Sequence, residues 1–155
     1  MRAGELAVPL VEALYRDAVA LANEARDWFD AARAPLGEAA HPYDGWEGRQ
    51  DPALGVALAC ESLRLTSRLM HIIAWAMERR GDAALDRGPE WVRTGSAQEL
   101  ARLPDEVRRM IAASQRLYQR AEALVPAPVD LPGPGGAAAL QALLGRRFGG
   151  SARLG

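Results

Sequence analysis

The sequence predicts an all-α protein: an antiparallel three-helix bundle over residues 5–125, followed by a flexible C-terminal tail over residues 126–155. Its length of 155 residues suits a single domain. Ala, Leu, Arg and Glu are abundant and β-branched residues are scarce, which favours helix because those side chains lose little entropy there. Three long stretches repeat apolar residues at helical spacing, and Pro- and Gly-rich stretches separate them.

The first helix is expected to begin near Ala7, with Pro9 tolerated in its opening turn. It should end before Pro35, because the residue preceding a proline avoids helical geometry. Residues 35–50 contain several Pro and Gly residues and are predicted to form a long loop. The apolar stripe of this helix comprises Leu10, Val11, Leu14, Tyr15, Ala18, Leu21, Ala22, Ala25, Trp28 and Phe29.

The second helix should begin at Asp51 as N-cap with Pro52 in the first helical position. It should end near Arg80, with Gly81 as a left-handed cap. A helix with apolar residues on two sides needs two partners, or a partner and a second subunit. One row comprises Leu54, Leu58, Leu65, Leu69, Ile72 and Ala76, and the other Val56, Leu63, Met70, Ile73 and Met77.

Residues 81–95 are predicted to be an irregular connection, and Ser96 with Glu99 has the spacing of a capping box. Pro104 is expected to be the first residue of a third helix that Pro126 closes. The tail is Pro- and Gly-rich apart from a short amphipathic segment over residues 137–148. The third helix carries its apolar stripe at Val107, Met110, Ile111, Ser114, Leu117, Tyr118, Ala121 and Leu124.

Bulk charge and hydropathy argue against several classes of function. All 19 basic residues are Arg, and the net charge of −1 offers no basic excess for a nucleic-acid partner. The longest apolar stretch, residues 69–77, is far shorter than the ~20 residues of a membrane span. No signal peptide is evident, so a soluble cytoplasmic protein is expected.

Catalytic and metal-binding patterns are missing from the sequence. His41 and His71 lie on different predicted elements, and no zinc-binding pattern occurs. Cys60 and His71 would be roughly 16 Å apart on one helix, too far to share a proton. Cys60 is therefore expected to be a small buried hydrophobe, and His71 a polar or interfacial position. The sequence predicts neither an enzyme nor a cofactor.

Several residues are candidates for contacts with other proteins. Arg64 and Arg68 lie one turn apart, and either pair structurally with Glu61 or Glu24, or dock a partner. The loop aromatics Tyr43 and Trp46, like Trp91 in the next connection, either cap the bundle ends or anchor an interface. In the tail, an apolar row suits docking into a groove or packing back on the bundle. That row includes Leu140, Leu144 and Phe148.

Three blocks of sequence are similar to the alphaproteobacterial RcdA family, which corresponds to the domain of unknown function DUF1465. They are LYRDAVALANEARDW at residues 14–28, ESLRLTSRLMHIIAWAM at 61–77 and SQRLYQRAEAL at 114–124. The resemblance implies a three-helix-bundle homodimer without catalytic activity. Such adaptors help the protease ClpXP, primed by a response regulator, to receive the cell-cycle regulator CtrA and other protein substrates.

The resemblance also gives roles to parts of this chain. Leu63, Leu65, Leu69, Ile72, Ile73 and Trp75 match the family's central helix and imply core and dimer surface. Adaptors of the family use a flexible C-terminal region, but the Pro- and Gly-rich tail departs from the family pattern. The leading hypothesis is therefore a noncatalytic proteolysis adaptor. The alternatives are a structural or regulatory helical homodimer of unknown pathway and, third, a metal- or small-molecule-binding bundle around His71 and Cys60.

Overall fold

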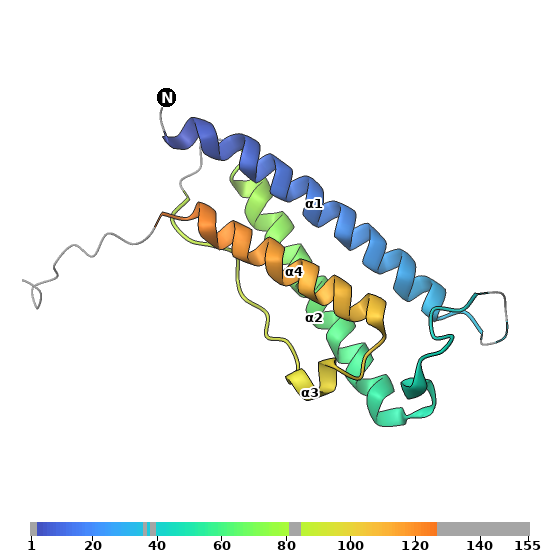
Figure 1. The fold of residues 1–155 in the computed structure, drawn as a ribbon. Coiled ribbons are helices and arrows are strands. Elements are labelled where there is room, and N and C mark those ends of the chain that lie inside the picture. The colour runs from blue at the N-terminus through green and yellow to red at the C-terminus, as the bar shows by residue number, and fades with distance from the viewer. Residues whose placement is uncertain (1–2, 36, 38–39, 81–84, 127–155) are drawn as a thin grey trace, which may run out of the picture.

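A computed structural model describes residues 3–35, 37, 40–80 and 85–126, and it is helical without any strand in these ranges (Figure 1). Three long helices dominate: α1 (Ala3–Ala32), α2 (Pro52–Glu78) and α4 (Asp105–Leu124). A 3-10 helix, η1 (Glu47–Gln50), precedes α2, and a single-turn helix, α3 (Ala97–Leu100), precedes α4. The predicted all-α class is confirmed. The predicted tail, residues 127–155, lies outside the described residues.

Helix α1 begins four residues earlier than expected, at Ala3, so Pro9 lies inside the helix rather than in its first turn. Pro9 has no N–H, so the carbonyl of Glu5 loses its usual partner, and the remaining turns tolerate that single loss. The helix ends at Ala32, before Pro35, as predicted. Its core row comprises Val11, Leu14, Ala18, Leu21 and Ala25.

Helix α2 begins as predicted. The carboxylate of Asp51 accepts a hydrogen bond from the N–H of Ala53 at 2.9 Å, and Pro52 is the first helical residue. The helix ends at Glu78 with Arg79 as its C-cap, whereas Gly81 lies outside the described residues. The first of its two predicted apolar rows is buried throughout: Leu54, Leu58, Leu65, Leu69, Ile72 and Ala76.

The entry into α4 contains the predicted capping box. The Ser96 hydroxyl accepts from the N–H of Glu99, and the Glu99 carboxylate accepts from the N–H of Ser96, both at 3.2 Å. Pro104 is the N-cap of α4 rather than its first residue, because its ψ of 144° is not helical. The helix buries Val107, Met110, Ile111, Ser114, Leu117 and Ala121.

The three long helices pack on one another, and their directions are set by the long connection before α4. Helix α1 is antiparallel to both others: Glu12 pairs with Arg80 at 2.8 Å, and Asp17 pairs with Arg120 at 2.7 Å. Helices α2 and α4 run parallel, since the chain returns along the bundle after α2 and restarts beside η1 (Figure 1). The predicted antiparallel bundle therefore holds for α1 against each partner, and not for α2 against α4.

The reach of the chain explains this return. At 27 residues α2 is about 40 Å long. The 18 residues between Glu78 and Ala97 can span about 60 Å when extended, enough to travel the full length of α2. A short connection would have placed α4 antiparallel to α2 instead.

Candidate protein-interaction site

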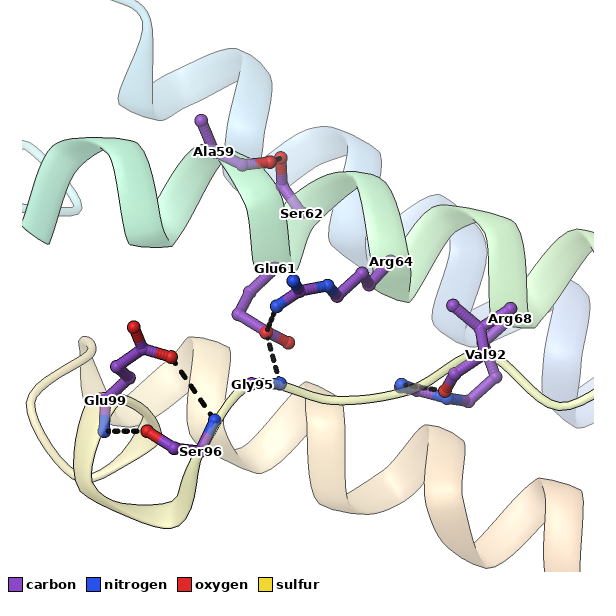
Figure 2. A network of polar contacts seen from close by, with 9 residues as sticks. All are labelled: Ala59, Glu61, Ser62, Arg64, Arg68, Val92, Gly95, Ser96 and Glu99. Atoms are coloured by element: carbon purple, nitrogen blue, oxygen red, sulfur yellow. Dashed lines mark hydrogen bonds and ion pairs between the residues drawn. The ribbon is translucent and has the colours of Figure 1, made fainter.

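Residues 85–96, here called the return segment, run antiparallel to α2, and one row of α2 side chains holds them. Four of these side chains bind main-chain groups of the segment. Glu61 accepts from the N–H of Gly95 at 2.6 Å, and the Arg68 guanidinium donates to the carbonyl of Val92 at 3.0 Å (Figure 2). Further along, the His71 ring lies 3.2 Å from the carbonyl of Glu90, and the Trp75 indole donates to that of Arg87 at 2.6 Å.

Arg68 is fully buried, which is unusual for an arginine. Besides Val92, its guanidinium donates to the Ser114 hydroxyl on α4 at 2.7 Å, and it lies 5.1 Å from the centre of the Trp91 ring. Burial lowers the pKa of Arg68, and the nearby Glu61 carboxylate acts in the opposite direction. Arg68 thus connects α2, α4 and the return segment.

Glu61 is the buried acidic partner in this row, with 2% of its side chain exposed. One carboxylate oxygen accepts from both the Arg64 guanidinium and the N–H of Gly95 (Figure 2). This hydrogen bond and ion pair raise the pKa of Arg64. Position 95 needs glycine, because a Cβ there would lie 2.7 Å from the Glu61 oxygen.

The far end of the row is formed by Trp75 and Arg79. The Arg79 guanidinium lies 5.0 Å from the centre of the Trp75 ring and pairs with Asp86 at 3.3 Å. Trp75 is buried, with 4% exposed. The indole ring therefore belongs to the core while its N–H reaches the return segment.

The structure thus places four candidate interaction residues together: Arg64, Arg68, His71 and Trp75 all lie on the row of α2 that faces the return segment. Arg64 pairs with Glu61, one of the structural pairings expected, whereas Glu24 pairs with Arg109 on α4. Arg68 pairs with neither and is inaccessible to a partner while the segment is in place. Partner contacts by the other three stay a prediction.

The candidate loop aromatics lie at the end of the bundle. Tyr43 packs between Trp28 and Trp46, with ring centres 5.8 and 5.2 Å apart, and burial raises its pKa. The Trp46 indole donates to the carbonyl of Arg102 at 2.8 Å, which ties the first connection to the start of α4. This arrangement matches the expectation that they cap the bundle, and a role as interface anchors stays a prediction. The candidates Leu140, Leu144 and Phe148 lie outside the described residues.

The second apolar row of α2 faces solvent. Four of its five residues are at least half exposed: Val56 by 64%, Leu63 by 70%, and Met70 and Met77 by 56% each. The fifth, Ile73, is partly buried and packs against the core instead. Between the four exposed residues lie the likewise exposed Ala59, Cys60, Thr66, Ser67 and Ala74. From Pro52 to Met77, no exposed residue of α2 is charged. The four large and five smaller exposed residues just named, from Val56 to Met77, are here called the α2 outer face. An uncharged helix face of this length is typical of an interface.

The outer face differs from the sequence-based expectations in two respects. Cys60 is exposed, so the prediction of a buried cysteine is wrong: it lies on the outer face rather than on the core row. The outer face itself was not among the candidate interaction residues, although its row was recognised. Its signal is the spacing of exactly seven residues between Val56, Leu63, Met70 and Met77, the repeat of helices that pack along a continuous seam.

Two further surveys cover the described part of the chain. It contains no group of three or more His, Cys, Asp or Glu side chains placed to hold a metal ion. None of its helices combines the length and hydropathy that crossing a membrane requires.

The chain was compared with known families, curated proteins and solved structures. Residues 3–127 match a family described as a protein of unknown function, DUF1465. No curated protein and no solved structure matches. Because the match covers all three long helices and most of the chain, the protein belongs to the DUF1465 family.

Proposed function

We propose that this protein is a noncatalytic adaptor in regulated proteolysis, similar to RcdA, that tethers substrates such as CtrA-like cell-cycle regulators to ClpXP in the cytoplasm. Membership of DUF1465 and the RcdA-like blocks at residues 14–28, 61–77 and 114–124 support this proposal. The observation that carries it is this family membership together with the RcdA-like blocks, and the α2 outer face adds a long uncharged surface suited to contacts with another protein. A response regulator is the further partner that the resemblance implies.

The outer face suits a homodimer in which α2 packs antiparallel to α2 of a second subunit. A two-fold axis requires that when residue i contacts residue j of the partner, j also contacts i. Val56 and Met77 lie equally far from the point between Thr66 and Ser67, as do Leu63 and Met70. An antiparallel pair centred there therefore opposes large residues along a seam of about 32 Å.

The composition of the face also supports pairing with a second copy. Small residues, Ala59, Cys60, Ser67 and Ala74, alternate with the large ones and leave space for them. The nine residues of the outer face are uncharged, and the neighbouring Arg64, whose side chain is 41% exposed, is paired with Glu61. We propose that the functional unit is this α2-paired homodimer of three-helix bundles.

Tethering needs no catalytic group. Holding a client near the unfoldase raises its effective concentration, so modest affinities at each contact are sufficient. In this proposal the dimer supplies the rigid body, and the tail, residues 126–155, supplies a second contact. Its apolar row of Leu140, Leu144 and Phe148 is the segment that would dock on a partner.

The alternative is a structural or regulatory helical homodimer of a different pathway, which the outer face favours equally. Degradation assays separate the two. We expect the full-length protein to accelerate degradation of a CtrA-like client by ClpXP with its response regulator, and removal of residues 126–155 to weaken the effect. A dimer that binds neither a protease component nor a degraded client would support the alternative and contradict the adaptor proposal.

A further inference from the structure

The return segment is held mainly through its main chain. The carbonyls of Arg87, Glu90 and Val92 and the N–H of Gly95 meet side chains of α2 in order along the helix. Contacts to main-chain groups do not depend on which side chains the segment carries. The α2 row therefore reads an extended backbone, and it would read in the same way that of another peptide with glycine at the places of Gly88 and Gly95.

The segment itself contributes little apolar burial. Among residues 85–96 only Pro89 is buried, Leu85 packs partly buried against the core, and Trp91 remains 44% exposed while packing on Arg68 and Tyr118. Four main-chain hydrogen bonds, two of them made by the charged Glu61 and Arg68, hold the segment, whereas burial of many large apolar side chains holds the long helices together. The segment is consequently attached more weakly than α1, α2 and α4 are attached to one another.

The polar row beneath the segment is also incompletely satisfied. Three buried side-chain atoms lack a hydrogen-bond partner among the described residues: Oε2 of Glu61, Nε of Arg68 and Nε of Arg79. All three belong to the α2 row that faces the return segment. The row thus has hydrogen-bonding capacity that residues 85–96 leave unused.

The groove beneath would keep its form without the segment, because other contacts fix its side chains. Arg68 is held by the Ser114 hydroxyl, which itself donates to the carbonyl of Ile111 at 2.7 Å. Trp75 is buried in the core, and Arg79 packs on its ring. A preformed groove lowers the free-energy cost of binding a new occupant.

We propose that the return segment is a releasable occupant of a peptide-binding groove between α2 and α4. When it detaches, the groove binds an extended peptide in trans, by its main chain and by an aromatic side chain placed between Arg68 and Tyr118. This goes beyond the adaptor proposal and requires neither a protease nor a dimer, so its failure would leave that proposal standing.

The first test measures hydrogen exchange in the full-length, unmodified protein. Local release predicts that the Gly95 amide, whose N–H is bonded to Glu61, exchanges at least a hundredfold faster than the amides of the buried α2 row around Leu65 and Leu69. Exchange of both regions at the same rate, governed by global unfolding, would overturn the proposal. This measurement uses no substitution and so does not depend on the folding of a variant.

The second test uses a fluorescein-labelled peptide with the sequence of residues 85–96, LDRGPEWVRTGS. In the wild-type protein the attached segment competes at high effective concentration. Trp91→Ala weakens that competitor, so the apparent affinity for the peptide should rise at least tenfold. Arg93→Ala is the matched control, because this exposed residue makes no hydrogen bond or ion pair within the described chain, and it should bind as wild type does.

Two further arms locate the binding. Affinity is measured by fluorescence anisotropy and compared with that of the Trp91→Ala protein for the unmodified peptide. A peptide carrying Ala in place of Trp91 should bind at least tenfold more weakly. A protein carrying both Arg68→Ala and Trp91→Ala should also bind the unmodified peptide at least tenfold more weakly. Equal affinity of wild-type and Trp91→Ala protein for the peptide, or binding that is unaffected by Arg68→Ala, would overturn the proposal. Circular dichroism of each variant confirms that the helices remain folded before binding is interpreted.

Discussion

At the scale of single residues, Arg68 is the side chain on which the most contacts converge. It is buried without an acidic partner in direct contact, and its charge is met by Ser114, Val92 and the face of Trp91. Hydrogen bonds made by charged groups contribute more to stability than neutral ones. The surface arginines, in contrast, pair in exposed positions where water screens the interaction.

Arg68→Ala should therefore lower the free energy of unfolding by about 2–4 kcal/mol, because it removes two hydrogen bonds, the contact with Trp91 and buried volume. Urea unfolding followed by circular dichroism at one fixed protein concentration measures the change. Arg120→Ala is the control: it breaks an exposed pair with Asp17 and should cost only about 0–1 kcal/mol. Similar losses in the two variants would contradict the role assigned to Arg68.

Trp75 and Trp46 form a second matched pair, since each indole donates to a main-chain carbonyl of a connection. Replacing either with Phe keeps an aromatic side chain but removes one hydrogen bond worth about 0.5–1.5 kcal/mol, together with part of the ring volume. We expect Trp75→Phe to loosen the segment and so speed hydrogen exchange of the Gly95 amide, and Trp46→Phe to leave that amide unchanged. Faster exchange in both variants, or in neither, would argue against the specific attachment of Trp75 to the return segment.

Sequence reasoning identified which polar residues of α2 matter but not what they contact. His71 stands out because it interrupts the apolar stretch of residues 69–77, and Arg68 because it lies one turn from Arg64. Their contacts lie 19 to 46 residues away, in Glu90, Val92 and Ser114, and a helical period describes only neighbours on the same helix. Cys60 is exposed although it was expected to be buried, because α2 has apolar residues on two sides and the sequence does not show which side becomes core.

At the scale of elements, local chemistry sets the helix ends. The carboxylate of Asp51 caps α2, and the Ser96–Glu99 capping box begins α3. Such signals lie within a few residues of the feature they determine, so the sequence predicts them well. The return segment lacks a comparable local signal, because its extended course depends on side chains of α2 that are distant along the chain.

Asp51→Ala should reduce the free energy of unfolding by about 1 kcal/mol, because the first turn of α2 loses its side-chain acceptor. Asp51→Asn retains an acceptor oxygen and should remain close to wild type, even though it loses the exposed contact with Arg102. Thermal or urea unfolding of the two variants checks this. Equal destabilisation would mean that the ion pair, rather than the cap, stabilises the helix.

At the scale of the whole molecule, helix direction follows from the long connection rather than from the helices. The apolar stripes predicted which faces become core, and the core rows of α1, α2 and α4 lie within them, although Leu10 of the predicted α1 stripe is 54% exposed. They carry no information on whether α4 runs with α2 or against it. The exposed second row is likewise evident in the sequence, but only the packed structure distinguishes the row left facing solvent.

Homodimer formation through the α2 outer face gives a prediction about the assembly. Wild-type protein should sediment as a dimer at micromolar concentration, and Leu63→Glu should shift it to monomer because two carboxylates would be buried near the two-fold axis. Gln119→Glu introduces the same charge on the exposed surface of α4 and should leave the dimer intact. A wild-type monomer, or a dimer that survives Leu63→Glu, would show that another surface or none is used.

The adaptor function is tested most directly by the initial rate at which ClpXP, with its response regulator, degrades a CtrA-like client. Adding the full-length protein should increase this rate several-fold, and removal of residues 126–155 should reduce the increase. An unchanged rate, together with no binding of the protein to the client or to any protease component, would contradict the account.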